Sequence, residues 1–433
     1  DDDDAKLLLN YIRGDQSREG VATNPYRTRS SRLGDIVNST PIFVGAPELN
    51  WPEYNAAGTN NEDLFGASGA SYSTFKLGTH AANGNLTSSS ASSRNEMVYV
   101  GANDGMLHGF LASTGVEQFA YIPGLIFSAD NNKGLHYLSE EDYRHQFYVD
   151  LTPIVSDVYI SRDHDGTTLG SKAWRTVLIG GLRAGGKGLF ALDVTDPGEL
   201  TDPGNDAENV VLWEFTDNNL GYVYSPATIA MMANGKWAAI IGNGYESGVD
   251  KAKLLIIYLE GGLDGTWTEN TDYFVLNTDD TLGNGLGTPR AVDLDGDKVV
   301  DVIYAGDLNG KMWAWDVSST TATNWTADAN RRNIFTATAG QAITTAPLVA
   351  TAPYGSADIP TSSDPNLLVL FGTGQYIEAT DNTSTDVMTY YGVLDNGNTT
   401  AHTRSNLAAR TLLTDSGLRT VKGSAVDWSN GEF

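Results

Sequence analysis

A repeat of short strand signals constrains the fold of this chain more than any other feature. Five apolar runs each open directly after a Ser-Pro, Thr-Pro or Ala-Pro pair, at Pro41, Pro153, Pro226, Pro289 and Pro347. Most of them continue into a second apolar run after a turn rich in Gly, Asn or Asp. Short apolar runs bounded by such residues are typical of strands in hairpins. The repeat therefore predicts an all-β chain built from successive hairpins.

A regular series of such units predicts a modified β-propeller with long inserted loops, and we expect one domain over residues 1–433. The interval from Pro41 to Pro153 is long enough for two repeats, and the strand signal at residues 95–115 predicts the second of them. A single helix is expected at residues 5–12, inside a lead-in segment of residues 1–35. Residues 50–94 are rich in Gly, Ser, Ala, Asn and Thr, which predicts a long flexible insertion.

The composition excludes several classes of function. The net charge is −27, which disfavours nucleic acid and anionic membrane surfaces as partners. Cysteine is absent, so the chain has no disulfide, no thiolate metal site and no cysteine nucleophile. No apolar run is long enough for a transmembrane segment. The chain opens on DDDDAK without a signal segment, which fits either a cytoplasmic protein or a piece of a longer exported one.

Alternating aspartates between two of the apolar runs predict a metal site. Positions 1, 3, 5 and 9 of a nine-residue loop are Asp293, Asp295, Asp297 and Asp301, and Val299 at position 7 offers its main-chain carbonyl. Carboxylates that alternate on a tight loop direct hard oxygen ligands to one point, and a flexible oxygen cage suits Ca²⁺ better than Mg²⁺. The loop departs from an EF-hand, because its glycine stands at position 4 and a tyrosine stands at position 12.

An acidic surface turn without a metal is the alternative interpretation. Four like charges within a few ångströms are unfavourable without a cation, which favours the metal site. The loop fills the first hairpin turn of its repeat, so we expect it at the rim of the propeller. In an earlier repeat Asp163, Asp165 and Gly166 form a weaker acidic turn. Two carboxylates seldom hold calcium without further ligands.

The chain carries no recognisable catalytic motif. It has no G-x-S-x-G, H-E-x-x-H or Walker A sequence, and its six histidines show no metal-ligand spacing. We therefore expect a protein that is not an enzyme. The generic integrin-recognition tripeptide occurs once, as Arg13, Gly14 and Asp15. Such a short motif arises by chance, so integrin binding and a structural or fortuitous role both stay open.

Six segments together carry a resemblance to a known family. They are YIRGDQSREG, RLGDIVNSTPIFVGAP, MVYVGANDGMLHGF, YIPG, TPRAVDLDGDKVVDVIYAGDLNGKMWAWD and GTGQYIE. The sequence resembles the C-terminal domain of the PilY/PilC family of type IV pilus tip-associated adhesins and biogenesis factors. The resemblance implies a quinoprotein-like propeller of seven blades with one calcium loop, held by Asp293, Asp295, Asp297, Asp301 and the carbonyl of Val299. It also implies that the chain is the C-terminal part of a longer exported protein.

The resemblance further implies a place at the pilus tip or outer surface of a Gram-negative bacterium. There the protein would regulate pilus extension and retraction, support twitching motility and attach to surfaces or host cells. Minor pilins of the type IV pilus and a host-cell receptor are the implied partners. We also expect the loop to act as a switch, because its carboxylates repel one another without calcium.

Two other classes of propeller are alternatives. A quinoprotein dehydrogenase also contains calcium, but this chain has no cysteine pair beside a quinone, and its acidic loop lies at a hairpin tip. An integrin-α-like or lectin-like propeller usually repeats the aspartate loop in several blades, whereas here one blade has it convincingly.

Overall fold

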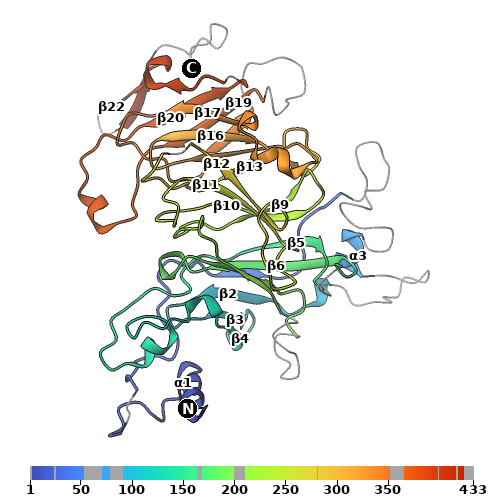
Figure 1. Cartoon of the computed structure of the whole chain (residues 1–433), viewed down its shortest axis with the longest axis vertical. Helices are drawn as coiled ribbons and strands as arrows, with labels where there is room; N and C mark the ends of the chain where they lie inside the picture. The colour runs from blue at the N-terminus through green and yellow to red at the C-terminus, as the bar shows by residue number, and fades with distance from the viewer. Residues whose placement is uncertain are drawn as a thin grey trace, which may run out of the picture. The chain divides into compact units, whose positions relative to one another are not determined.

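The structure is a computed structural model. It describes residues 2–23, 26–52, 71–78, 91–162, 168–198, 210–279, 281–351, 365–397, 399–415 and 418–423. Its contacts divide the chain into two compact units. The first comprises Asp1–Ile229 and Tyr258–Thr268, and the second comprises Ala230–Ile257 and Glu269–Phe433. Each unit is built mainly from antiparallel sheets (Figure 1).

The first unit contains two sheets of four strands, each an antiparallel meander in chain order. One sheet is β1 (Ile42–Val44), β2 (Met97–Gly101), β3 (Leu107–Leu111) and β4 (Glu117–Tyr121). The other is β5 (Ile154–Ile160), β6 (Ala173–Gly181), β7 (Leu189–Asp193) and β8 (Val211–Phe215). Most residues of β6 and all of β7 are buried. Their near-continuous apolar sequences follow from this burial, because both faces of these strands are covered.

The second unit contains three further sheets, of five, five and three strands, and β9 begins just before this unit. The first is ordered β12-β11-β10-β9-β14, from β9 (Thr228–Met232), β10 (Trp237–Gly242), β11 (Lys253–Tyr258), β12 (Tyr273–Asn277) and β14 (Val299–Val300). The second is ordered β13-β15-β16-β17-β21, from β13 (Arg290–Val292), β15 (Val302–Gly306), β16 (Lys311–Asp316), β17 (Arg331–Thr336) and β21 (His402–Thr403). The third is ordered β18-β19-β20, from β18 (Leu348–Thr351), β19 (Leu367–Gly372) and β20 (Tyr390–Asp395).

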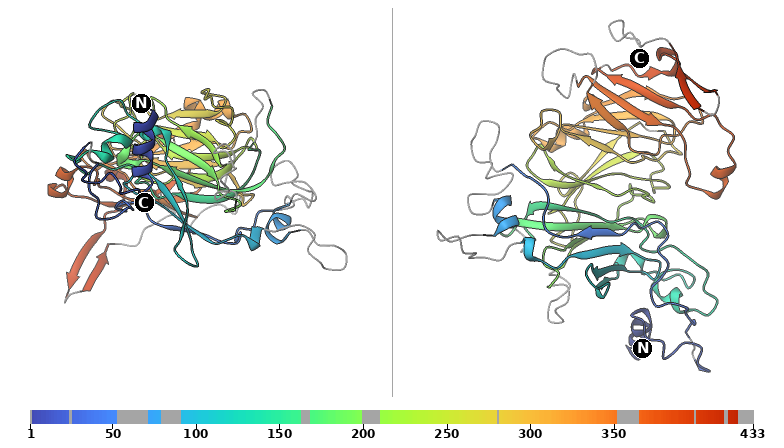
Figure 2. Two further views of the ribbon diagram at one scale, coloured as in Figure 1. Left: turned by 90° about the horizontal axis from the view of Figure 1, so that it is seen from below. Right: turned by 180° about the vertical axis from the view of Figure 1, so that it is seen from behind.

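A separate hairpin and several short helices complete the described part of the chain. Strands β22 (Thr411–Asp415) and β23 (Leu418–Lys422) pair only with each other there, and their hairpin projects from the unit (Figure 2, left). The α-helices are α1 (Asp2–Ile12) and α3 (Tyr72–Leu77). The 3₁₀ helices are η1 (Ala91–Ser93), η2 (Gly124–Ile126), η3 (Leu135–Ser139), η4 (Arg183–Gly185), η7 (Ala322–Thr326), η8 (Asp328–Asn330), η9 (Ala379–Thr383) and η10 (Arg404–Asn406).

The five prolines mark the first strands of five sheets. Strands β1, β5, β9, β13 and β18 each begin one or two residues after one of them. The expectation of an all-β fold made from repeated hairpins is thereby confirmed. Proline suits this position because it lacks a main-chain donor and is tolerated at the beginning of a strand.

Two of the glycines that end the second strand of a sheet, Gly242 and Gly101, are required by packing. Gly242 ends β10, and a Cβ there would lie 2.0 Å from the carbonyl oxygen of Gly287. Gly101 ends β2, and a Cβ there would lie 2.2 Å from the carbonyl oxygen of Val149. Gly287 and Val149 each belong to the segment that leads into the next sheet. The main chain of one sheet therefore crosses the end of its neighbour too closely for any side chain.

Each unit has its own apolar core. In the first, side chains of α1, β2, β3 and β7 meet in one cluster, which includes the fully buried Tyr11 and Phe190. In the second, strands β15, β16, β17, β19 and β20 contribute to one cluster. Trp313 and Trp315 lie on one face of β16 and are 5% and 1% exposed, and Met312 and Ala314 on its other face are fully buried. The sheet around β16 is therefore covered on both faces.

One buried ion pair joins two sheets of the second unit. The side chain of Asp395 on β20 is 1% exposed, and Arg332 on β17 donates to both of its oxygens. The hydroxyl of Tyr304 on β15 donates to Asp395 Oδ2 at 2.7 Å. Both carboxylate oxygens are thus hydrogen-bonded, as burial of a charged group requires.

Part of the predicted insertion at residues 50–94 is anchored on the first unit. Helix α3 begins at the N-cap Ser71, and the ring of its Tyr72 packs edge-on against Trp174 with the centroids 4.8 Å apart. The hydroxyl of Tyr72, a residue 3% exposed, donates to Asp157 Oδ2 at 2.6 Å. Residues 53–70 and 79–90 lie outside the described residues.

Other expectations have mixed outcomes. The helix predicted at residues 5–12 is α1, which begins three residues earlier. The expectation of two repeats between Pro41 and Pro153 is wrong, because β2 and β3 pair in one sheet with β1 and the added length is a long connection after β1. The described residues form five sheets of three or more strands, so seven blades and the single-domain extent stay predictions. In the part that the structure describes, no helix is long and apolar enough to cross a membrane.

Candidate metal centre

The acidic loop connects two paired strands of one sheet and also reaches a neighbouring sheet. Strand β13 ends at Val292 and pairs antiparallel with β15. The loop therefore joins two neighbouring strands at the same end of one sheet. Within the loop, Val299 and Val300 form the short strand β14, which pairs in parallel with Met231 and Met232 of β9. The predicted hairpin position is correct. The loop is not a free tip, however, because its second half is a strand of the adjacent sheet.

Three of the predicted ligands meet at one point. Carboxylate oxygens of Asp293, Asp295 and Asp297 lie within 4.8 Å of one another. Main-chain N–H groups of the loop hold them there. Gly296 N–H donates to Asp293 Oδ1 at 2.7 Å, and Lys298 N–H donates to Asp293 Oδ2 at 2.8 Å. The loop therefore gathers three acidic side chains without any help from a distant segment.

Asp301 closes the loop from the side of β15. Its Oδ2 accepts the N–H of Leu294 at 2.7 Å, and it lies outside the group of three carboxylates. Partial burial raises the pKa of Asp301 to about 6. The hydrogen bond from Leu294 opposes this rise, and the charges of Asp295, Asp297 and Asp293 add to it. A cation beside the four carboxylates would offset the two causes that raise this pKa, which are burial and the neighbouring negative charges.

The pKa of Asp297 is also raised, mainly by burial, and its neighbouring carboxylates add to the rise. Asp297 Oδ1 accepts the N–H of Val299 at 2.8 Å. Among the residues that the structure describes, none of the four aspartates forms an ion pair with a basic side chain. A set of hard oxygens without a basic partner fits a divalent cation such as Ca²⁺.

The backbone of the loop is held in a conformation that few residues favour. Gly296 has a φ of +86° and nothing within 4 Å of where a Cβ would lie. Lys298 has a φ of +75°, which is costly for a residue with a Cβ. This conformation turns the N–H groups of Gly296 and Lys298 toward Asp293, so the hydrogen bonds to that carboxylate stabilise it.

The roles of Asp293, Asp295, Asp297, Asp301 and Val299 as ligands all stay predictions. Val299 is buried in β14, and its carbonyl was expected to complete the site. Sequence reasoning missed β14 itself. The only sequence signal for it is the pair of adjacent β-branched residues, Val299 and Val300. The weaker acidic turn predicted at Asp163, Asp165 and Gly166 lies outside the described residues.

The predicted integrin motif lies at the C-terminus of α1. Gly14 has a φ of +104°, and its N–H donates to the carbonyl of Tyr11 at 2.9 Å. The N–H of Asp15 donates to the carbonyl of Asn10 at 2.9 Å. These two bonds form a Schellman motif, which explains the glycine by helix termination. Arg13 and Asp15 are exposed, and integrin binding stays a prediction.

Calcium affinity is expected to fall as the pH is lowered through about 6, the raised pKa of Asp301. Below that value the folded protein holds a proton on Asp301, which a cation must displace. The apparent affinity should then fall by about tenfold per pH unit. Calorimetric titration with Ca²⁺ on either side of this pH measures the effect. Asp301→Asn should flatten the dependence of calcium affinity on pH. A wild-type affinity that stays the same across this pH range would contradict a cation held by Asp301 with its raised pKa.

The repeated sheets define a β-propeller, and the acidic loop is a candidate calcium site on it. The chain belongs to the family described as the PilY1 beta-propeller domain, whose profile matches residues 33–423. This result confirms the resemblance found in the sequence.

Named relatives and a solved structure agree with this family. The chain is 35% identical to the type IV pilus biogenesis factor PilY1 of Pseudomonas aeruginosa strain PAK, over 98% of this chain and 35% of that protein. It is 34% identical to a homolog in Xylella fastidiosa, over 94% of this chain and 25% of that protein. The crystal structure of the Pseudomonas aeruginosa PilY1 C-terminal domain aligns with a TM-score of 0.60 and 32% identity, over 90% of this chain and 75% of that chain. The chain thus spans about a third or less of the length of these curated relatives.

Proposed function

We propose that this chain is a calcium-binding module of type IV pilus biogenesis. The observation that carries the proposal is the cluster of Asp293, Asp295 and Asp297 on a loop of a propeller whose named relatives are type IV pilus biogenesis factors. The names of these relatives also favour a protein that is not an enzyme over a quinoprotein dehydrogenase. Export, a position at the pilus tip and contact with minor pilins belong to the same proposal.

The loop's own contacts suggest how the site would act. Asp293, Asp295, Asp297 and Asp301 would hold the cation, and bound Ca²⁺ would supply the positive charge that offsets their repulsion. Without that charge the acidic half of the loop is destabilised. Its other half, Val299 and Val300, pairs with β9. Disorder in the loop would therefore weaken the pairing between two sheets.

Two states of the loop follow from this link. In one, β14 pairs with β9 and the sheets are held together, and in the other the pairing is lost. A pilus component that binds the paired state better would shift the population toward it. We propose that pilus extension and retraction, and attachment to surfaces, depend on this equilibrium.

The proposal is tested in the bacterium that carries the chain, with Asp301→Asn in the full-length protein. We expect fewer surface pili or altered twitching, because the loop would hold calcium less tightly. Asp130→Asn is the matched control, since Asp130 also accepts a main-chain N–H in an exposed turn, from Asn132 at 3.1 Å. Protein levels are compared by immunoblot. Wild-type piliation and motility in the Asp301 variant, at every calcium concentration, would reject the proposed role.

A further inference from the structure

A polar cavity of the first unit has several arginines in its wall. Its volume is about 510 Å³, which lies within the range of about 300–1,000 Å³ typical of small-molecule sites. Its lining comes from residues 27–35 before β1, from Asn103 and Asp104 between β2 and β3, and from Tyr143 and His145 after η3. All of these segments belong to the first unit.

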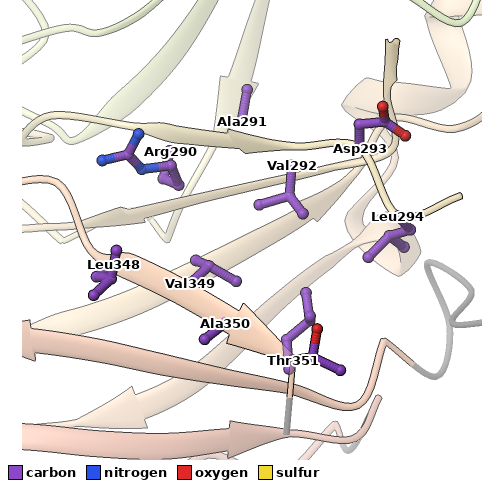
Figure 3. A pocket seen from close by; sticks show the side chains of 10 residues that line it. Arg290, Ala291, Val292, Asp293, Leu294, Leu348, Val349, Ala350 and Thr351 are labelled. Atoms are coloured by element: carbon purple, nitrogen blue, oxygen red, sulfur yellow. The ribbon is translucent and has the colours of Figure 1, made fainter. Parts of the chain in front are cut away.

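The charge of this lining distinguishes it from a second cavity, which lies in the second unit along β13 and β18 and has a volume of about 470 Å³. Figure 3 shows that most side chains of the second cavity are aliphatic. The cavity of the first unit instead has Arg27, Arg29 and Arg32 in its wall, and we call it the arginine cavity. Residues 20–34 contain no acidic side chain. In a chain whose net charge is −27, this segment reverses the sign of the charge locally.

Hydrogen bonds fix the wall of the arginine cavity. The N–H of Gly34 donates to Asp104 Oδ2 at 2.7 Å, and the N–H of Asn103 donates to the main-chain carbonyl of Asp35 at 3.1 Å. Both bonds tie the segment before β1 to the connection between β2 and β3. The cavity is therefore formed by the protein alone, as small-molecule sites usually are.

The acidic side chains of the lining already have partners within the protein. Asp35 Oδ2 accepts Nδ2 of Asn103 at 3.3 Å and lies 2.8 Å from Nε2 of His145. Asp104 Oδ1 lies 3.1 Å from Nε2 of His108, whose side chain is buried. These contacts leave the two carboxylates little need of a further cation.

Two of the three arginines have donors to spare. Arg29 forms a buried ion pair with Glu19 at 2.8 Å, so its charge is offset. Arg27 donates from Nε to a main-chain carbonyl at 3.0 Å, and its guanidinium lies 4.4 Å from the ring centroid of Tyr143. In the described part of the chain, the Nη groups of Arg27 and the guanidinium of Arg32 form no hydrogen bond or ion pair.

Neutral donors lie beside these guanidinium groups. The hydroxyls of Ser30 and Ser31, and the main-chain N–H groups of residues 30–33, form no hydrogen bond within the described residues. The lining thus combines charged and neutral donors that lack acceptors. A ligand that supplies a negative charge together with further oxygen atoms would complement them.

The surrounding charges favour a ligand with a single negative charge. Asp35 and Asp104 remain in the lining, so a dianion such as phosphate meets more repulsion there than a carboxylate does. A guanidinium also matches a carboxylate through two parallel hydrogen bonds. In the described residues Asp35 Oδ1 accepts no hydrogen bond, so it can accept one from a hydroxyl of the ligand.

We infer that the arginine cavity binds a hydroxylated monocarboxylate of the sugar-acid class. Arg27 and Arg32 would bind the carboxylate of the ligand. Its hydroxyl groups would contact Ser30, Ser31 and Asp35. The inference goes beyond the proposed function and holds whether or not the acidic loop binds calcium.

The probe for this site is sodium glucuronate, titrated calorimetrically at low ionic strength into the whole chain after removal of calcium and chelator. Glucose has the same ring without the charge, and inorganic phosphate has the charge without the ring. We expect saturable binding of glucuronate at millimolar concentrations. Phosphate should bind at least tenfold more weakly, and glucose should not bind.

Two matched variants locate the effect. Arg32→Gln removes a charge at an exposed position without a hydrogen bond, so it should fold normally and weaken glucuronate binding at least tenfold. Arg144→Gln replaces another exposed arginine, which lies outside the lining beside Tyr143, and should leave binding unchanged. Asp301→Asn should also leave it unchanged, which separates this inference from the calcium proposal.

Several results would overturn the inference. Glucuronate could fail to bind the wild type at millimolar concentrations, or glucose could bind as tightly as glucuronate, which would remove the role of the carboxylate. Phosphate could bind as tightly as glucuronate, which would contradict the preference for a singly charged ligand. Equal glucuronate binding by Arg32→Gln and Arg144→Gln would show that binding does not depend on the arginine cavity.

Discussion

Asp301→Asn is expected to raise the melting temperature of the calcium-free protein and to reduce the stabilisation that calcium confers. The folded protein holds the pKa of Asp301 at about 6, above its ordinary value. A carboxyl group with a raised pKa costs stability once it ionises. The stability of the calcium-free protein should therefore fall as the pH rises from about 4 to about 6, and the full cost is present at neutral pH.

The size of this cost is on the order of 1 kcal/mol, because Asp301 is only partly buried and solvent screens its neighbours. Asparagine removes the charge and can still accept the N–H of Leu294. In the wild type, calcium at about 100 times its dissociation constant should add about 2.7 kcal/mol. The variant should bind calcium at least tenfold more weakly and gain less at the same concentration.

Differential scanning calorimetry of both proteins, with a chelator and with calcium, measures these effects. Asp130→Asn serves again as the control and should respond to calcium as the wild type does. A calcium-free Asp301→Asn protein that melts below the wild type at neutral pH would show that the ionised carboxylate is not a source of instability.

Asp395→Ala is expected to destabilise the second unit by about 3–5 kcal/mol, the largest effect that we predict for a single side chain. The substitution leaves the guanidinium of Arg332 in a buried place without its partner, and it removes the acceptor of the Tyr304 hydroxyl. An unpaired buried charge costs far more than the pair contributes. Chemical denaturation monitored by tryptophan fluorescence measures the loss.

Two further variants separate the unpaired charge from lost packing. Tyr304→Phe removes one hydrogen bond to Asp395 and should cost only about 1 kcal/mol. The double variant Arg332→Met with Asp395→Leu removes both charges and should recover much of the stability lost in Asp395→Ala. If the double variant is as unstable as the single one, charge burial is not the reason for the loss.

The sequence predicted the features that depend on local residue order. Proline before each first strand is a local requirement of the main chain, so the prolines showed where five sheets begin. The acidic loop was predictable because its carboxylates accept main-chain N–H groups only a few residues away, as Asp293 does from Gly296 and Lys298.

The features that the sequence did not predict depend on distant partners. Val299 and Val300 form a strand only because Met231 and Met232 present a free edge, and two residues give no periodicity. The anchor at Tyr72 depends on Asp157, which lies 85 residues further along the chain. Strand β1 pairs with β2 across a long connection, so sequence spacing alone suggested two repeats in place of one sheet.

Calorimetric titration of the chelator-treated protein with Ca²⁺, beside Asp293→Asn and Asp301→Asn, tests the central claim most directly. We expect saturable binding to a single site in the wild type, with at least tenfold weaker binding in each variant. Absence of binding in the wild type up to millimolar calcium, or equal binding in all three proteins, would contradict a calcium site formed by this loop.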